Sequence, residues 1–123
     1  MGQLVREHWR PELSHTVDFM TNTGTVIAAT DWGEEPQRKT LKPSLHGSHG
    51  ELLHDVGLPA FYIVLKDVQS ALVQRPRAQR AAGVIYRPAT ERESHYYTAT
   101  LREQFDTVIH IDETTAVTSL DPV

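Results

Sequence analysis

The sequence predicts an α/β fold, because short β-prone runs alternate along the chain with stretches that have helical features. The clearest strand candidate is the apolar run from Ala60 to Leu65, whose composition suits a strand buried on both faces. The clearest helix candidate starts at Ser48, which stands three residues before Glu51 in the spacing of a capping box. An apolar stripe then leads to Gly57, which ends the helix.

The N-terminal third of the chain predicts further elements. The first nine residues suit a short helix, which Pro11 ends. From Thr16 to Ala29, two β-prone runs flank Asn22 to Gly24, where the glycine can supply a positive φ. We therefore expect a β-hairpin. Residues Asp31 to Pro43 mix glycine, proline and charged residues without an apolar period, which predicts a surface loop.

The C-terminal half continues the alternation. Asp67 is placed to cap a helix that Pro76 terminates. Two β-branched runs, Gly83 to Tyr86 and Thr107 to Ile111, predict strands. Because no internal repeat or linker is visible, we treat residues 1–123 as a single domain.

Composition excludes several classes of function. The net charge of -4, from 12 basic and 16 acidic residues, leaves no basic surface for nucleic acid. The absence of cysteine excludes disulfides, thiolate nucleophiles and cysteine-based zinc sites, and makes the cytoplasm the default location. Apolar runs are too short to span a bilayer and the first residues are no signal peptide, so we expect neither membrane association nor export.

Histidine, which occurs seven times, is the residue type best suited to general-base catalysis or metal binding. Three of them, His46, His49 and His54, fall in one short stretch. In a helix that starts near Ser48, the last two are five residues apart and lie on different faces, unlike the i, i+4 pair of a zinc helix. A metal site is therefore the weaker interpretation; the stronger is that His54 favours the helix C-terminus and the others are loop or cap residues.

Two other histidines lie in β-prone segments. Strand alternation places His110 on the face opposite to Ile109 and Ile111, just before Asp112. His110 could line a site at the carboxyl edge of a sheet, but we favour a hydrogen-bonded strand residue. His95 precedes two tyrosines, which suggests an aromatic packing cluster.

Nucleophile and phosphate motifs are missing from the sequence. None of the serines at positions 14, 44, 48, 70, 94 and 119 sits in a Gly-x-Ser-x-Gly elbow. The glycines form neither a dinucleotide-binding nor a Walker pattern. From the residues alone, then, no complete active site is visible.

Three segments occur together in a recognisable order: Thr23 to Trp32, Pro43 to His54, and Gly83 to Asp112. In that order they resemble the second half of proteins of the erythromycin esterase family. The sequence departs from the family pattern at Asp18, where a glycine is usual. It departs again at His46, in place of a common proline, and at Gly50, in place of a larger residue.

The resemblance implies an incomplete mixed sheet with flanking helices, the C-terminal part of a larger α/β esterase-like fold. Members are understood to hydrolyse a macrolide's lactone ester with a histidine as general base on water, assisted by carboxylates and arginine. Because those groups lie ahead of the segment that resembles Met1 to Glu7, we assign no catalytic residue, metal or cofactor here. We expect a small-molecule ester as substrate of the complete protein, association with a missing N-terminal half, and poor solubility without it.

Loops at sheet ends carry binding groups, so the turn from Met20 to Gly24 is the expected substrate contact. Its candidate substrate-binding residues are Met20, Thr21, Thr23 and Gly24. Two alternatives stay open: a non-catalytic binding or interaction module that retains the fold, and an independent hydrolase that uses His46, His49 or His110.

Overall fold

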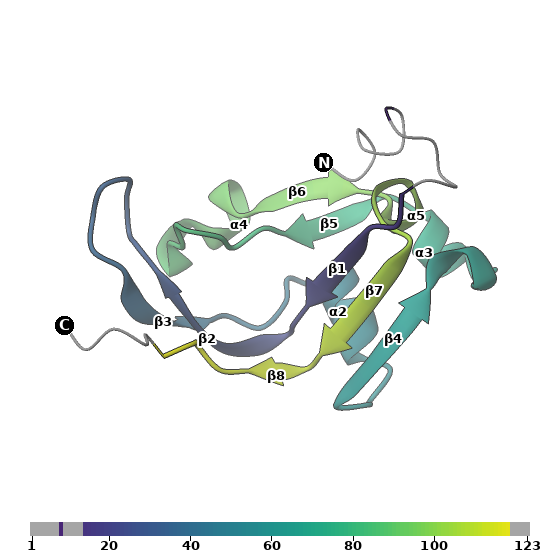
Figure 1. Cartoon of the computed structure of the whole chain (residues 1–123), viewed down its shortest axis with the longest axis horizontal. Coiled ribbons are helices and arrows are strands. Elements are labelled where there is room, and N and C mark those ends of the chain that lie inside the picture. Colours follow the sequence, from purple (N-terminus) through teal and green to yellow (C-terminus); the bar gives the residue numbers. More distant parts are fainter. Residues whose placement is uncertain (1–7, 9–13, 119–123) are drawn as a thin grey trace.

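A computed structural model describes His8 and residues 14–118 of the chain (Figure 1). Apart from His8, the helix expected in the first nine residues lies outside the described residues. The strands are β1 (Val17–Met20), β2 (Thr23–Ala28), β3 (Gln37–Leu41), β4 (Ala60–Val64), β5 (Arg77–Arg80), β6 (Tyr96–Ala99), β7 (Thr107–Ile111) and β8 (Glu113–Thr114). The short helices are α2 (His49–His54), α3 (Ala71–Gln74), α4 (Glu91–Ser94) and α5 (Leu101–Gln104), with 3-10 turns η2 (Leu65–Asp67) and η3 (Pro88–Thr90).

The strands form mixed sheets, which confirms the α/β prediction. One sheet has the order β1-β7-β4, with β1 parallel and β4 antiparallel to β7. A second has the order β3-β2-β8, in which β2 pairs antiparallel with β3 and parallel with β8. Strands β5 and β6 form an antiparallel pair. None of the helices in the described part of the chain is long and apolar enough to cross a membrane.

The first two sheets are joined by one long, bent pair of parallel strands. Val17 lies opposite Thr107 and Thr23 lies opposite Glu113, an offset of 90 residues in both cases. The register therefore continues from β1–β7 into β2–β8, as Figure 1 shows. At the bend, the carbonyl oxygen of Asp112 accepts hydrogen bonds from the amides of Asn22, at 3.1 Å, and Thr23, at 3.0 Å.

The prediction of a hairpin from Thr16 to Ala29 is wrong, because β1 and β2 follow one another without pairing. Strand β1 pairs with β7, and β2 pairs with β3 and β8. Gly24 does have a positive φ, of 145°, but it lies inside β2 rather than in a turn. A Cβ atom at Gly24 would lie 2.0 Å from the carbonyl oxygen of Thr114. The glycine is thus needed for the close passage of β8 beside β2.

Three other expectations need correction. The loop expected from Asp31 to Pro43 contains β3, which is held by its ladder with β2 despite its polar composition. Asp67 ends the turn η2 instead of capping a helix, and α3 has only four residues. The run from Gly83 to Tyr86 makes only an isolated bridge between Ile85 and Ala29.

The helix after Ser48 and the strand from Thr107 to Ile111 are confirmed. The Ser48 hydroxyl accepts a hydrogen bond from the amide of Glu51 at 3.2 Å. The carboxylate of Glu51 accepts one from the amide of Gly47 at 3.1 Å, one residue earlier than a capping box requires. Gly57 follows the helix with a φ of 83°.

The sheet β1-β7-β4 is buried on one face only. Its inner face carries Met20 and Val108 of the core cluster, whose buried members are Met20, Leu53, Leu65, Val73, Leu101 and Val108. The other face exposes large apolar side chains: Val17, Phe19, Tyr62 and Ile111. Strand β4 therefore exists as predicted but is not buried on both faces, because this face of the sheet is uncovered and leaves Tyr62 71% exposed.

Candidate functional site

A pocket of about 140 Å³ lies where β1 ends, beside β5 and the segment that leads into α2. It is lined by Asp18, Phe19, Met20, Thr21, Val26, Leu41, Ser44, Ser48, Gly50, Gln79, Arg80 and Ala82. The lining combines apolar side chains with hydroxyl, amide and charged groups. Such a mixture, with few polar groups converging on one cavity, is typical of small-molecule sites.

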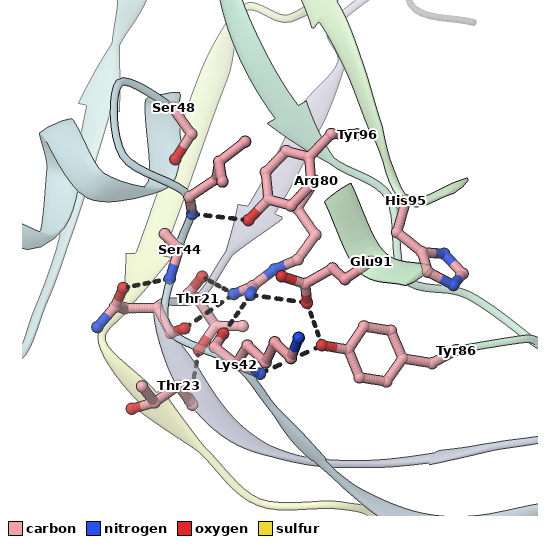
Figure 2. A network of polar contacts seen from close by, with 12 residues as sticks. Thr21, Thr23, Lys42, Ser44, Ser48, Arg80, Tyr86, Glu91, His95 and Tyr96 are labelled. Carbon is pink, nitrogen blue, oxygen red and sulfur yellow. Dashed lines mark hydrogen bonds and ion pairs between the residues drawn. The ribbon is translucent and has the colours of Figure 1, made fainter. Parts of the chain in front are cut away.

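Arg80 lines this pocket and lies at the centre of a network of polar contacts, which Figure 2 shows. Its Nη2 donates hydrogen bonds to the carbonyl oxygens of Thr21 and Asn22, both at 2.9 Å. Its Nη1 donates to the carbonyl oxygen of Lys42 at 2.5 Å and lies 3.6 Å from the carboxylate of Glu91. The guanidinium of β5 therefore fixes the bend between β1 and β2 at the pocket.

Glu91 compensates the charge of Arg80 in a buried setting, since the two side chains are 6% and 9% exposed. The hydroxyl of Tyr86 donates a hydrogen bond to Glu91 and accepts one from the amide of Lys42 at 3.2 Å. Burial, together with this carboxylate, raises the pKa of Tyr86 to about 12, so the hydroxyl keeps its proton. The network (Figure 2) thus forms a satisfied, rigid support behind the pocket wall.

Asp18 is the acidic group of the pocket. Burial raises the pKa of its carboxyl to about 6, against the opposing hydrogen bond from the backbone of Phe19. The amide Nε2 of Gln79 donates a hydrogen bond to Asp18 Oδ2 at 3.3 Å. No cation among the described residues forms an ion pair with this carboxylate. The Oε1 of Gln79 is also buried and has no hydrogen-bond partner.

The histidines of the 46–54 stretch do not belong to the pocket lining, and each has a different hydrogen-bond partner. The exposed His46 pairs with Glu51 at 3.1 Å. Buried His49 bonds through Nε2 to the carbonyl oxygen of Ala99 at 2.6 Å, and burial lowers its pKa. His54 instead contacts Asp112 at 2.7 Å. Among the described residues, no three histidine or acidic side chains are grouped to hold a metal ion.

His110 and His95, the two histidines of the β-prone segments, are hydrogen-bonded and buried. His110 bonds through Nε2 to Asp112 at 3.0 Å and packs its ring 5.2 Å from Phe61, which fits the strand-residue interpretation. His95 accepts a hydrogen bond from the amide of Arg87 at 2.9 Å and interacts with the carbonyl oxygen of Ala81 at 3.2 Å. Its aromatic neighbour is Tyr86, with ring centroids 5.1 Å apart.

The structure divides the four residues predicted to bind substrate. Met20 and Thr21 line the pocket. Thr23 and Gly24 lie outside its lining, in β2, where they pair with β8. Sequence reasoning assigned no site role to Asp18, Gln79 or Arg80, although the departure at Asp18 from the family's usual glycine was a visible signal.

Comparison with known proteins settles the family. The sequence model of erythromycin esterase matches residues 1–114. The chain belongs to the erythromycin esterase family. The match covers every residue that lines the pocket, from Asp18 to Ala82, so the pocket is part of the erythromycin esterase region of the chain.

Two crystal structures share the fold of this erythromycin esterase family chain. One is a succinoglycan biosynthesis protein, 21% identical, with a TM-score of 0.75 and coverage of 93% of this chain. The other is a Bacillus cereus protein, 16% identical, with a TM-score of 0.76 and the same coverage. The chain spans only 27% and 28% of their lengths.

Proposed function

We propose that this chain forms the substrate-binding, C-terminal part of an ester hydrolase of the erythromycin esterase type, and that it does not catalyse hydrolysis alone. The pocket carries this proposal. Its volume of about 140 Å³ is below the ~300–1,000 Å³ of sites that enclose a drug-sized ligand. It therefore suits one substituent of a large ester, with the rest of the cleft supplied by other polypeptide.

The chemistry of the lining supports a role in substrate binding without a role in the hydrolysis itself. Hydrolysis by activated water needs a base within hydrogen-bond reach of that water, and a group that orients the base. The lining residues include no histidine, and their only carboxyl group is that of Asp18. A histidine base of the kind the family resemblance implies would have to come from outside this pocket.

The uncovered sheet face supports the need for more polypeptide. Val17, Phe19, Tyr62 and Ile111 expose apolar surface on the side of the sheet away from the core. Large exposed apolar patches mark surfaces that another structural element covers. The matched crystal structures are more than three times as long as this chain. We propose that the remainder of the hydrolase packs on this face.

An activity assay tests the proposal. The purified 123-residue chain should hydrolyse neither a macrolide lactone nor a simple aryl ester above the uncatalysed rate. Hydrolysis at an enzyme's pace would contradict the proposal. Loss of such activity in folded alanine variants of His46, His49 or His110 would then favour the independent hydrolase.

Self-association tests the uncovered face. Light scattering should show that the chain associates, and that Tyr62→Lys reduces the association by placing a charge in the apolar face. Val117→Lys is the matched control, because Val117 is also highly exposed but lies outside the sheet. A wild-type chain that stays monomeric at high concentration would show that the uncovered face does not drive association, which would count against the proposed cover.

The lack of a histidine in the lining also fits a second function, a binding module that retains the fold without chemistry. The nucleotide sequence ahead of the Met1 codon separates the two. An in-frame continuation that encodes a histidine-containing first half supports the hydrolase, whereas a ribosome-binding site and start signal support the module.

A further inference from the structure

We propose that this pocket selects ligands that carry a protonated amine, which the carboxylate of Asp18 and the side-chain carbonyl of Gln79 bind together. The inference rests on the proposed function in one respect, that the pocket holds a substituent of the substrate. It adds the chemical class of that substituent and the residues that recognise it.

The first argument is the imbalance between donors and acceptors. Gln79 is only 4% exposed, and its Oε1 has no hydrogen-bond partner. Its Nε2 donates to Asp18 Oδ2 at 3.3 Å, which orients the amide, and both residues line the cavity. A buried acceptor without a donor costs free energy. A ligand that brings N–H groups would remove that cost.

The second argument is that no cation within the described part of the chain pairs with Asp18 in the pocket. Arg80 also lines the cavity, but its donors are directed to the carbonyl oxygens of Thr21, Asn22 and Lys42. Its charge is compensated by Glu91 at 3.6 Å. The nearby Tyr97 of β6 stays neutral, because burial and the charge of Asp18 raise its pKa.

The free-energy cost of ionising the buried Asp18 carboxyl predicts how amine binding depends on pH. Burial raises the pKa of this carboxyl to about 6, which measures how poorly the pocket solvates the ionised form. Above pH 6 Asp18 carries a charge that a bound ammonium would neutralise. Below pH 6 Asp18 gains a proton and the attraction is lost.

The apolar part of the lining fits the same ligand. Val26 of β2 and Leu41 of β3 add apolar side chains to the lining. An amine with small alkyl or aryl substituents would place carbon against such residues and its N–H groups against the acceptors. With about 140 Å³ available, a single small group can enter.

The experiment compares benzylamine with benzyl alcohol, which has a similar shape but no charge at neutral pH. NMR titration of the 123-residue chain at pH 7.5 gives the affinity of each probe, and the shifted amide signals locate it. We expect benzylamine to bind at the pocket about tenfold more tightly, as a charge-assisted hydrogen bond allows. Lowering the pH to 5 should remove most of that preference.

Variants assign the preference to its residues. Asp18→Asn keeps the shape of the side chain and should abolish the discrimination, and Gln79→Met should weaken benzylamine binding. Glu93→Gln is the matched control, because it makes the same change in charge on an exposed side chain of α4. Circular dichroism spectra confirm that each variant is folded before its titration is interpreted.

The outcomes test the amine preference and the pocket's role as a ligand site separately. Equal binding of both probes at the pocket would overturn the amine preference while leaving the pocket as a ligand site. A preference that survives in Asp18→Asn would overturn the role of Asp18. If neither probe shifted the pocket signals, both the preference and the pocket's part in the proposed function would be rejected.

Discussion

His54 Nδ1 lies 2.7 Å from Asp112 Oδ1, and so links the end of α2 to the end of β7 across 58 residues of sequence. The same carboxylate oxygen lies 3.0 Å from Nε2 of the buried His110. Because the backbone carbonyl of Asp112 also holds the bend at Asn22 and Thr23, this residue joins the helix, the strand and the bend.

Replacement of Asp112 by asparagine should lower the pKa of His54. The hydrogen bond to Asp112 raises the pKa of His54, and the two histidines lower the pKa of Asp112. In Asp112→Asn, proton NMR of the imidazole should therefore show His54 titrating closer to 6.5. Asp31→Asn is the control, since that carboxylate pairs with Arg87 instead. An unchanged titration of His54 would contradict the pairing.

The same pair should stabilise the fold within a limited pH range. The raised pKa of His54 means that its contribution is complete below about 6.5 and is lost as the pH rises through the folded-state pKa. The lowered pKa of Asp112 means that its contribution is complete above about 3.8 and is lost as the pH falls through the folded-state pKa. Chemical denaturation should show the largest difference between wild type and Asp112→Asn between these limits.

Substitution of Gly24 by alanine should destabilise the protein more than the same change at Gly33. Both glycines have positive φ, but a Cβ at Gly24 would lie 2.0 Å from the Thr114 carbonyl oxygen, whereas one at Gly33 meets nothing within 4 Å. Gly33→Ala should cost about 1 kcal/mol from backbone conformation alone. Gly24→Ala should cost roughly 2–4 kcal/mol, because β8 must also move. Equal costs in urea denaturation would argue against the close passage of β8.

Local signals were sufficient where an element is stabilised by its own sequence. The helix after Ser48 was predictable because its cap residues lie within three positions. The strand that contains His110 was predictable because its other residues are all β-branched. The pairing of β1 with β7 was not predictable from local signals, because it joins residues 90 positions apart. The positive φ of Gly24 was read as a turn, although only the distant Thr114 explains it.

The pocket was harder to predict than the elements around it. Met20 and Thr21 were named because they fall in the turn expected at the end of a β-prone run, and the structure places both in the pocket lining. Gln79 and Arg80 lie in the polar stretch Arg77–Arg80, which has no apolar residue larger than alanine and becomes a strand only through its ladder with β6. Their importance depends on partners contributed by the bend and by Glu91, which no local pattern reveals.

Removal of the Tyr86 hydroxyl should destabilise the network behind the pocket. Tyr86→Phe leaves Glu91 and the amide of Lys42 each without one hydrogen-bond partner in a buried setting. Thermal or chemical denaturation should show a loss of about 1–3 kcal/mol. Tyr62→Phe is the control, because that tyrosine is 71% exposed and should change stability by less than about 0.5 kcal/mol. A Tyr86→Phe variant with unchanged stability would mean that this network does not stabilise the fold beside the pocket.

Asp18→Asn should stabilise the protein at neutral pH. Because burial raises the pKa of Asp18 to about 6, the folded state holds this proton more tightly than the unfolded state, and stability falls as the pH rises from 3.8 through 6. Above pH 6 the variant should gain on the order of 1 kcal/mol in the free energy of unfolding, an amount reduced by the partial exposure of the group.

The pH profile distinguishes this effect from an ordinary change in packing. The gain in the free energy of unfolding of Asp18→Asn should shrink below pH 6. It should disappear below about 3.8, where the wild-type carboxyl is neutral in both the folded and the unfolded state. Glu93→Gln should show no such profile, and a gain independent of pH in Asp18→Asn would contradict the electrostatic explanation. A variant that is more stable yet binds benzylamine less well cannot owe its lost binding to unfolding, which leaves the charge of Asp18 as the cause.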